Sequence, residues 1–262
     1  MGHPLSARLS AASPTGVSIL PVAGIPEIRA GDDLAAVLIG CLADNDLALQ
    51  DGDVVVVASK VVSKAAGMQV ETMPAAHARA RELAGTTGFE PGFVELILSE
   101  SREVLRARPR VLVVETVHGL VCANAGVDRS NAGTPGIALL LPRDSDASAR
   151  ELLDRLAGHF AAEIAVVISD TFGRPFRNGL VNVAIGVAGM RPIRDYRGEA
   201  DPEGHVLEGT ELAVADELCS AAELVMNKLD RVPVAIVRGY DWQPDPGSVK
   251  PLLREPALDY FR

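Results

Sequence analysis

The feature that most constrains the fold is a run of four valines at 54–57, which follows a turn-forming Asp-Gly-Asp sequence at 51–53. Valine is β-branched and favours extended backbone, and an uninterrupted apolar run is typical of a strand with both faces covered. The run therefore predicts a strand at Val54–Ala58 in the interior of a layered protein. Two lysines, Lys60 and Lys64, follow this strand closely.

The rest of the chain mixes strand-like and helix-like segments without a regular βαβ order. Short apolar runs predict strands at 17–22, Val111–Thr116, 137–141, 164–169, 181–188 and 232–238. Composition and helical spacing predict helices at 31–47, 74–84, 91–101, 146–162 and 212–226. Polar segments are interpreted as loops at 122–131 and 172–179, and as a charged excursion at 195–209. This mixture predicts an α+β fold, that is, a mixed α/β architecture.

Length and composition exclude several classes of protein. A chain of 262 residues, 48% hydrophobic and 23% charged, fits one large globular domain or two small ones. The formal net charge of −10 argues against a nucleic-acid partner, because such proteins normally carry a basic face. Apolar runs stay well below the roughly 20 residues that a membrane-spanning helix needs. We therefore expect neither nucleic acid nor membrane as a partner.

The N-terminal segment and the cysteines favour a cytoplasmic location. Residues 1–15 are expected to form a flexible tail, and they lack the apolar segment of a signal peptide. The cysteines, Cys41, Cys122 and Cys219, lie far apart and form no CxxC pair. Neither a disulfide framework nor a zinc knuckle is expected from this spacing, which suits a reducing compartment. The remaining residues, 16–262, are expected to form one module with one or two subdomains.

Several familiar catalytic motifs are missing from the sequence. It contains no Gly-Lys dipeptide, hence no Walker-type phosphate loop, and no GxGxxG fingerprint for a dinucleotide. The histidines form neither HxxxH nor HExxH, and no GxSxG elbow presents a nucleophilic serine. Any catalytic chemistry must therefore come from other acidic, basic and hydroxyl side chains.

Acidic residues near the predicted strands are the first candidates for a site. Asp170 directly follows the strand predicted at 164–169, and Thr171 beside it adds a hydroxyl group. Carboxylate and hydroxyl oxygens suit Mg²⁺, and the alternative interpretation is a turn or a helix cap. Asp128 and Asn131 form a second polar pair, which would either share a site or make a local Asx turn.

Basic residues near strand ends are candidates for binding anions. Lys60 and Lys64 are four residues apart and would share one face of a helical turn, together facing either a phosphate chain or solvent. Ser59 precedes them and adds a hydroxyl group. Arg174 and Arg177 suit carboxylates or phosphates, or else surface ion pairs. Together with the acids, these residues favour a metal–nucleotide site without specifying the reaction.

Beyond these local patterns, the chain resembles the coenzyme F420-0:L-glutamate ligase family, whose members attach γ-linked glutamate to a deazaflavin coenzyme. The matching strings are ILPVAGIPEI with GDDL, DGDVVVVASKVVSKAAG, NAGVDRSN, VVISDTFGRPFRNGLVNVAIGVAG, and ADELCSAAELVMNK with PVAIVRG, in the family's order. The resemblance implies a fold with mixed sheets that is particular to this family, and an intertwined homodimer. The reductase-like domain that some relatives carry is not expected here.

The resemblance also implies a reaction. GTP and a divalent metal, Mg²⁺ or Mn²⁺, with K⁺ as a further candidate, would activate the terminal carboxylate of the precursor F420-0 as an acyl phosphate. The amine of L-glutamate would then attack and release phosphate. Activation is needed because a carboxylate is a poor electrophile, and metal ions offset the charge between the reacting anions. The alternatives are a related carboxylate–amine ligase, a non-catalytic F420-binding paralogue and a metal-dependent phosphohydrolase.

The resemblance assigns roles position by position. Asp128 and Asp170 match metal-binding aspartates and are the expected catalytic residues, and Thr171 matches a ligand of a second metal. The positions expected to contact the nucleotide are Leu20, Pro21, Val22, Ala23, Ser59, Lys60, Lys64, Asn131, Met226, Asn227, Lys228, Leu229, Asp230, Arg231, Val232 and Pro233.

One departure from the family concerns Lys228. Many members have Gly and then Glu or Gln after the residue that matches Met226, whereas this chain has Asn227 and Lys228. A lysine repels cations, so the ligand set of the second metal is put in question. The alternative role for Lys228 is to neutralise phosphate.

Overall fold

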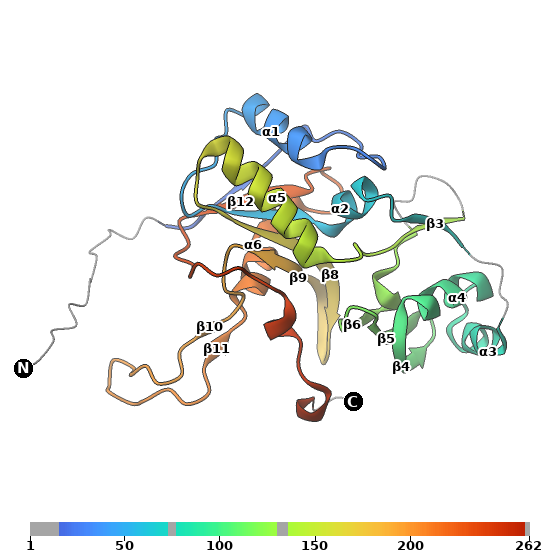
Figure 1. Ribbon diagram of the computed structural model, residues 1–262. Helices are drawn as coiled ribbons and strands as arrows, with labels where there is room; N and C mark the ends of the chain where they lie inside the picture. The colour runs from blue at the N-terminus through green and yellow to red at the C-terminus, as the bar shows by residue number, and fades with distance from the viewer. Residues whose placement is uncertain (1–15, 73–76, 130–135, 260–262) are drawn as a thin grey trace, which may run out of the picture.

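The computed structural model describes residues 16–72, 77–129 and 136–259 (Figure 1). The tail predicted at 1–15 lies outside the described residues, as do Asn131 and the start of the helix predicted at 74–84. Within the described residues, the largest sheet has five strands in the order β1-β12-β2-β8-β9. Their bounds are Ser18–Pro21 for β1, Val234–Arg238 for β12, Val54–Ala58 for β2, Ala165–Arg174 for β8 and Arg177–Ala188 for β9. The β2–β8 pair is parallel and its neighbours are antiparallel, which confirms the predicted mixed architecture.

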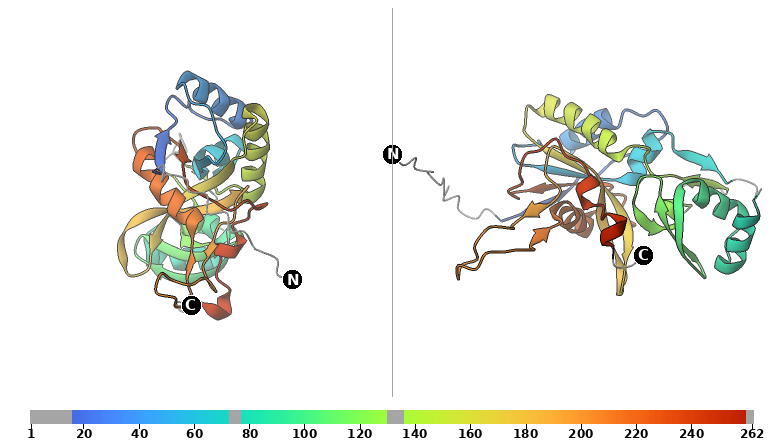
Figure 2. Two further views of the ribbon diagram at one scale, coloured as in Figure 1. Left: turned by 90° about the vertical axis from the view of Figure 1, so that its left-hand side faces the viewer. Right: turned by 60° about the horizontal axis from the view of Figure 1, so that its bottom comes forward.

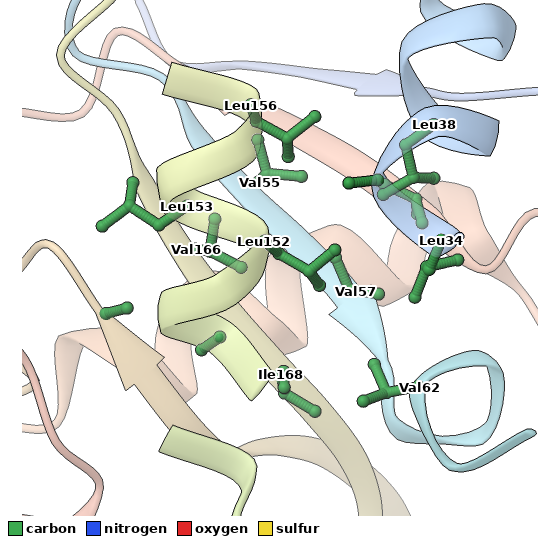
Figure 3. Packing of buried hydrophobic residues seen from close by; sticks show 14 of the residues in the cluster. Leu34, Leu38, Val55, Val57, Val62, Leu152, Leu153, Leu156, Val166 and Ile168 are labelled. Atoms are coloured by element: carbon green, nitrogen blue, oxygen red, sulfur yellow. The ribbon is translucent and has the colours of Figure 1, made fainter. Parts of the chain in front are cut away.

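The valine run lies at the centre of this sheet, and its four residues are at most 2% exposed. Successive side chains of a strand point to opposite faces. Val55 and Val57 accordingly pack with helices α1 (Leu34–Asp44) and α5 (Ser145–Phe160) on one face. Val54 and Val56 pack with α6 (Val214–Met226) on the other face. Figure 3 shows the first face, with Leu34, Leu38, Val55, Val57, Val62, Leu152, Leu153, Leu156, Val166 and Ile168 labelled.

A second, smaller unit lies beside the main sheet (Figures 1 and 2). It contains α3 (Ala78–Thr87), α4 (Pro91–Ser99) and a sheet of β4 (Ser101–Arg108), β5 (Val111–Thr116) and β6 (Val121–Ala123). The short strands β3 (Gln69–Glu71) and β7 (Ile137–Leu139) pair next to it. These elements share a separate hydrophobic cluster. The smaller unit thus has a core of its own.

The short elements around the sheet follow from local sequence signals. Asp33 caps α1 by accepting a hydrogen bond of 3.0 Å from the Ala36 amide, as expected for an aspartate at this position. Helix α2 (Ser59–Ala65) follows β2 without a connecting loop. Two short strands, β10 (Arg194–Asp195) and β11 (Glu211–Leu212), pair at the base of the charged excursion. The three cysteines, Cys41, Cys122 and Cys219, are buried and free.

The structure corrects the prediction for the segment after 169. The predicted strand end and the loop at 172–179 are replaced by a long hairpin, in which β8 runs to Arg174 and β9 begins at Arg177. Phe172 pairs with Val181 and Gly173 with Leu180. The backbone hydrogen bonds of this pairing stabilise an extended conformation that glycines such as Gly173 and Gly179 do not favour by themselves. Asp170 therefore lies within a strand rather than at its end.

One further prediction is wrong in the smaller unit, and one strand was not predicted. The segment 122–131 was expected to be a loop, but its first two residues belong to β6, and a short 3-10 helix, η1 (Asn124–Gly126), follows. The helix predicted at 91–101 is present as α4, whereas the strand β4 at 101–108 was not predicted. In both places strand pairing with β5 determines the conformation. In the part of the chain that the structure describes, no helix has the length and hydropathy needed to cross a bilayer.

Candidate functional site

A pocket of about 580 Å³ opens between α2, the β8–β9 hairpin, the end of α6 and the segment that follows η1. This volume is in the range of small-molecule sites. The β2–β8 pairing explains why residues distant in sequence meet here. Ala58 pairs with Ser169 in the parallel register. The residues that follow them in the chain, Ser59 and Asp170, therefore lie next to each other.

Asp170 is the acidic residue at the base of this pocket. The Ser59 hydroxyl donates a hydrogen bond of 2.9 Å to Asp170 Oδ1. Burial and, to a smaller extent, the charge of Asp128 raise the pKa of Asp170 to about 6, against the opposing effects of Ser59, the Thr171 amide and Lys60. A carboxylate in this position is therefore costly to ionise, which means that a bound cation would stabilise it.

Asp128 comes to the same pocket from the smaller unit. Its backbone is held by two hydrogen bonds to Leu139 of β7, of 3.0 Å and 2.8 Å. Gly126 precedes it with φ of 69°, and a Cβ there would lie 2.8 Å from the Leu141 side chain. Lys60 of α2 forms an ion pair of 2.5 Å with Asp128 Oδ2. The ion pair joins the smaller unit to the main sheet across the pocket.

A second polar network lies at the other end of the pocket, between the hairpin and α6. The Thr171 hydroxyl donates to Asn182 Oδ1 over 2.8 Å, and Asn182 Nδ2 donates to Glu223 Oε2 over 2.7 Å. Lys228 donates to Thr171 Oγ1 over 2.7 Å and forms an ion pair of 2.5 Å with Glu223 Oε1. The network fixes the position of the Lys228 ammonium group at the pocket wall.

Another ion pair joins Lys64 of α2 to Glu27. The hydrogen bond from Lys64 lowers the pKa of Glu27, and the charges of Arg231 and Arg29 act in the same direction. Lys60 and Lys64 both line the pocket from α2. That they face a phosphate chain stays a prediction.

The structure brings most of the predicted site residues to this pocket. They are Ser59, Lys60, Lys64, Asp128, Asp170, Thr171, Met226, Asn227, Lys228, Arg231, Val232 and Pro233. Leu20–Ala23 do not line it: Val22 is buried in the core, and the wall is formed by Ile25, Pro26 and Glu27 a few residues later. Leu229 and Asp230 also lie off the wall, and the Leu229 side chain is exposed. Asn131 is outside the described residues.

Glu27, Asn182 and Glu223 line the pocket but were not predicted. Asn182 is the register partner of Thr171 across the hairpin, and the hairpin was interpreted as a loop. Glu223 lies on α6, which was predicted, but nothing in a helical pattern shows that this face meets Thr171. Glu27 follows a proline in an irregular segment. One indication of these residues was present in the sequence: Asn182 is a polar residue within the apolar strand predicted at 181–188.

The pocket can be tested for its fit to metal ions. Asp128 and Asp170 line the same pocket, and their negative charges repel each other. A divalent cation between them would relieve this repulsion. Among the described residues, no group of three or more His, Cys, Asp or Glu side chains is arranged to hold a metal. Lys60 holds one oxygen of Asp128, so the aspartate pair fits a cation only when Lys60 moves to a bound anion, which would also supply the remaining ligands. The position at Thr171 does not fit, because the Lys228 ammonium contacts three oxygens there. These oxygens come from Thr171, Asn182 and Glu223.

The chain is similar to known proteins over most of its length. The family model F420-0:Gamma-glutamyl ligase matches residues 24–239. A coenzyme F420:L-glutamate ligase from Methanothermobacter thermautotrophicus is 49% identical over 253 residues, which cover 94% of this chain and 99% of the relative. Proteins of the same name from Methanopyrus kandleri and Halobacterium salinarum are 41% and 43% identical, over 94% and 92% of this chain and 99% and 94% of their own lengths. The chain therefore belongs to the F420-0:gamma-glutamyl ligase family.

Proposed function

We propose that this chain is a GTP- and divalent-metal-dependent ligase that joins L-glutamate to the deazaflavin precursor F420-0. One observation carries the proposal: Asp128, in its ion pair with Lys60, lines the same pocket as Asp170. Two carboxylates and nearby ammonium groups suit a metal-bound nucleotide. Family membership supplies the acceptor and the amino acid.

The proposed chemistry has two steps. A carboxylate oxygen of F420-0 attacks the γ-phosphorus of GTP, the bond to the β-phosphate oxygen breaks, and GDP leaves with that electron pair. The amine of L-glutamate then attacks the acyl carbon of the mixed anhydride, and phosphate leaves as the amide forms with loss of a proton. The first step places several anionic oxygens close together, so the protein must supply positive charge and must position both partners.

The lysines and arginine of the pocket can supply part of this charge. Lys60 and Lys64 approach from α2, and Arg231 approaches from the segment after α6. Each lysine is held by a carboxylate partner, Asp128 or Glu27, which limits its freedom before the nucleotide binds. Ordered cations lose less conformational entropy on binding phosphate, which makes the site preorganised.

Asp128 and Asp170 would hold the divalent ion, Mg²⁺ or Mn²⁺. When bound, the ion would neutralise phosphate charge and align the reacting oxygens. Ser59 keeps the Asp170 carboxylate in one orientation through its hydrogen bond. The backbone bridge between Asp128 and Leu139 fixes the main chain at the other acid. The protein would thus bring two carboxylates to the ion, of which Ser59 orients one.

A homodimer is also part of this proposal, and the β8–β9 hairpin supports it. Phe176 at the hairpin turn is 90% exposed and Leu180 is 66% exposed. Exposed apolar side chains on a projecting element are typical of interaction surfaces. Leu180 also lines the pocket, so a partner that covers the hairpin would exclude water from the reacting groups.

Mass spectrometry of F420-0 after incubation with the protein, GTP, Mn²⁺ or Mg²⁺ and L-glutamate tests the proposed function. The expected product is the precursor joined to glutamate through an amide, together with GDP and phosphate. An arm with ATP and an arm with other carboxylic acids distinguish a related ligase. Phosphate release without L-glutamate would indicate a phosphohydrolase, and binding of F420-0 without any product would indicate a non-catalytic paralogue.

A further inference from the structure

The ammonium group of Lys228 lies in a cage of oxygens that resembles a cation site. Lys228 Nζ is 2.7 Å from Thr171 Oγ1, 3.3 Å from Asn182 Oδ1 and 2.5 Å from Glu223 Oε1. A lysine ammonium has three donor hydrogens, so these oxygens can accept one each. The hydroxyl, amide and carboxylate come from β8, β9 and α6.

The oxygens of this cage are themselves held in place. Thr171 donates its own hydrogen to Asn182 Oδ1, so the lone pairs of its oxygen are left for Lys228. Asn182 Nδ2 donates to Glu223 Oε2, which turns its carbonyl oxygen away from Glu223 and towards the ammonium group. The network has one positive and one negative charge, so it is balanced without a metal ion.

A divalent ion at the Thr171 hydroxyl would conflict with this arrangement. Mg²⁺ binds oxygen ligands at about 2.0–2.1 Å and needs near-octahedral geometry. It would have to approach Thr171 Oγ1 while an ammonium group contacts the same atom at 2.7 Å. Two cations at such a separation repel each other.

We propose that Lys228 is a built-in cation that replaces a second divalent metal in this chain. The protein then holds a single divalent ion per subunit, between Asp128 and Asp170, when nucleotide is bound. Lys228 supplies the other positive charge from the protein itself, fixed by Thr171, Asn182 and Glu223. This inference rests on the proposed function only in taking the pocket as a site for a metal-bound nucleotide.

Counting bound Mn²⁺ tests the inference without measuring activity. Equilibrium dialysis with Mn²⁺ and guanosine 5′-(β,γ-imido)triphosphate gives the number of ions per nucleotide-loaded subunit. We expect one ion in the unmodified protein and two in Lys228→Glu, because the substitution removes the ammonium and adds a carboxylate beside Glu223. Lys228→Gln, which removes the charge and adds no new carboxylate, should show a second ion of weaker affinity.

The matched control is Lys250→Glu, which makes the same charge change at an exposed lysine outside the pocket. It should bind one ion, like the unmodified protein. Thermal melting of each variant verifies folding, which we expect to persist because the Lys228 side chain is 56% exposed.

The outcomes separate this inference from the proposed function. Two ions in the unmodified protein, or a single ion in both Lys228 variants, would overturn the built-in cation and leave the ligase proposal standing. Absence of nucleotide-dependent Mn²⁺ binding in every protein would overturn both.

Discussion

Ser59 and Asp170 are 111 residues apart in the chain, and the Ser59 hydroxyl donates a hydrogen bond of 2.9 Å to the Asp170 carboxylate. The contact exists because β2 and β8 pair in parallel, with Ala58 opposite Ser169. A rigid pair of central strands therefore sets the position of the acid. Positions on such strands are more precise than positions on loops, which would suit the proposed role of this carboxylate in holding a cation.

Replacing Asp170 with Asn should abolish ligase activity and stabilise the metal-free protein. The native pKa is about 6, above the value near 3.9 of an unfolded aspartate. The native state therefore binds the proton more tightly, and stability falls as pH rises from about 4 to about 6. Above that range ionised Asp170 costs about 3 kcal/mol, which Asn avoids.

Urea denaturation in the presence of EDTA, at pH 4 and pH 7.5, measures this difference. The stabilisation by Asp170→Asn should be present at pH 7.5 and largely lost at pH 4. Asp154→Asn, at an exposed position of α5, is the control. It should change neither the ligase activity nor the free energy of unfolding. A variant that keeps near-normal activity would show that Asp170 is not needed for catalysis.

Lys60→Ala should weaken nucleotide binding more than it reduces stability. A charge-assisted contact to phosphate is worth about 1.5–3 kcal/mol, which corresponds to roughly a 10- to 150-fold rise in Kd for GTP. The Lys60 side chain is 41% exposed, so its loss should alter the free energy of unfolding only slightly. Calorimetric titration with GTP and Mn²⁺, with Lys250→Ala as the control, gives the answer. Equal affinities in both variants would place Lys60 away from the nucleotide.

Phe176→Ser should weaken self-association of the chain. The side chain is 90% exposed at the turn of the β8–β9 hairpin, and truncating an aromatic residue at the centre of an interface commonly costs 2 kcal/mol or more. We expect the dimer dissociation constant from analytical ultracentrifugation to rise at least about tenfold. Val117→Ser changes another exposed apolar residue and should leave the constant unchanged. A monomeric unmodified protein would refute the proposed dimer.

Gly186→Ala should destabilise the protein, although it adds a single methyl group. Its Cβ would lie 2.4 Å from the backbone oxygen of Ser145, where α5 packs against β9. Backbone atoms must shift to relieve this contact, at a cost of about 1–3 kcal/mol. Gly40→Ala in the exposed part of α1 meets nothing within 4 Å and should stabilise by about 0.5–1 kcal/mol. Urea denaturation that shows both variants equally stable would contradict the packing of α5 on the sheet.

Part of the fold could be predicted because its signals are local. The valine run of β2 has one favourable conformation and needs cover on both faces, and Asp33 begins α1 by accepting the Ala36 amide. Helix α6 likewise follows from its composition. The strand β4 and the hairpin beyond Asp170 could not be predicted in this way, since their conformation depends on hydrogen bonds to partner strands.

The sequence by itself determined which residue types are available for chemistry, among them Asp128, Asp170 and the lysines of α2, and it determined the family of the chain. Only the tertiary structure decided how these residues and their neighbours combine. Asn182 and Glu223 have no motif of their own, and they reach the pocket because the hairpin pairs Asn182 with Thr171 and α6 packs against β9. The environment of Lys228 is set by the same packing, since a charge takes its function from the atoms within a few ångströms, and these come from segments far away in the chain.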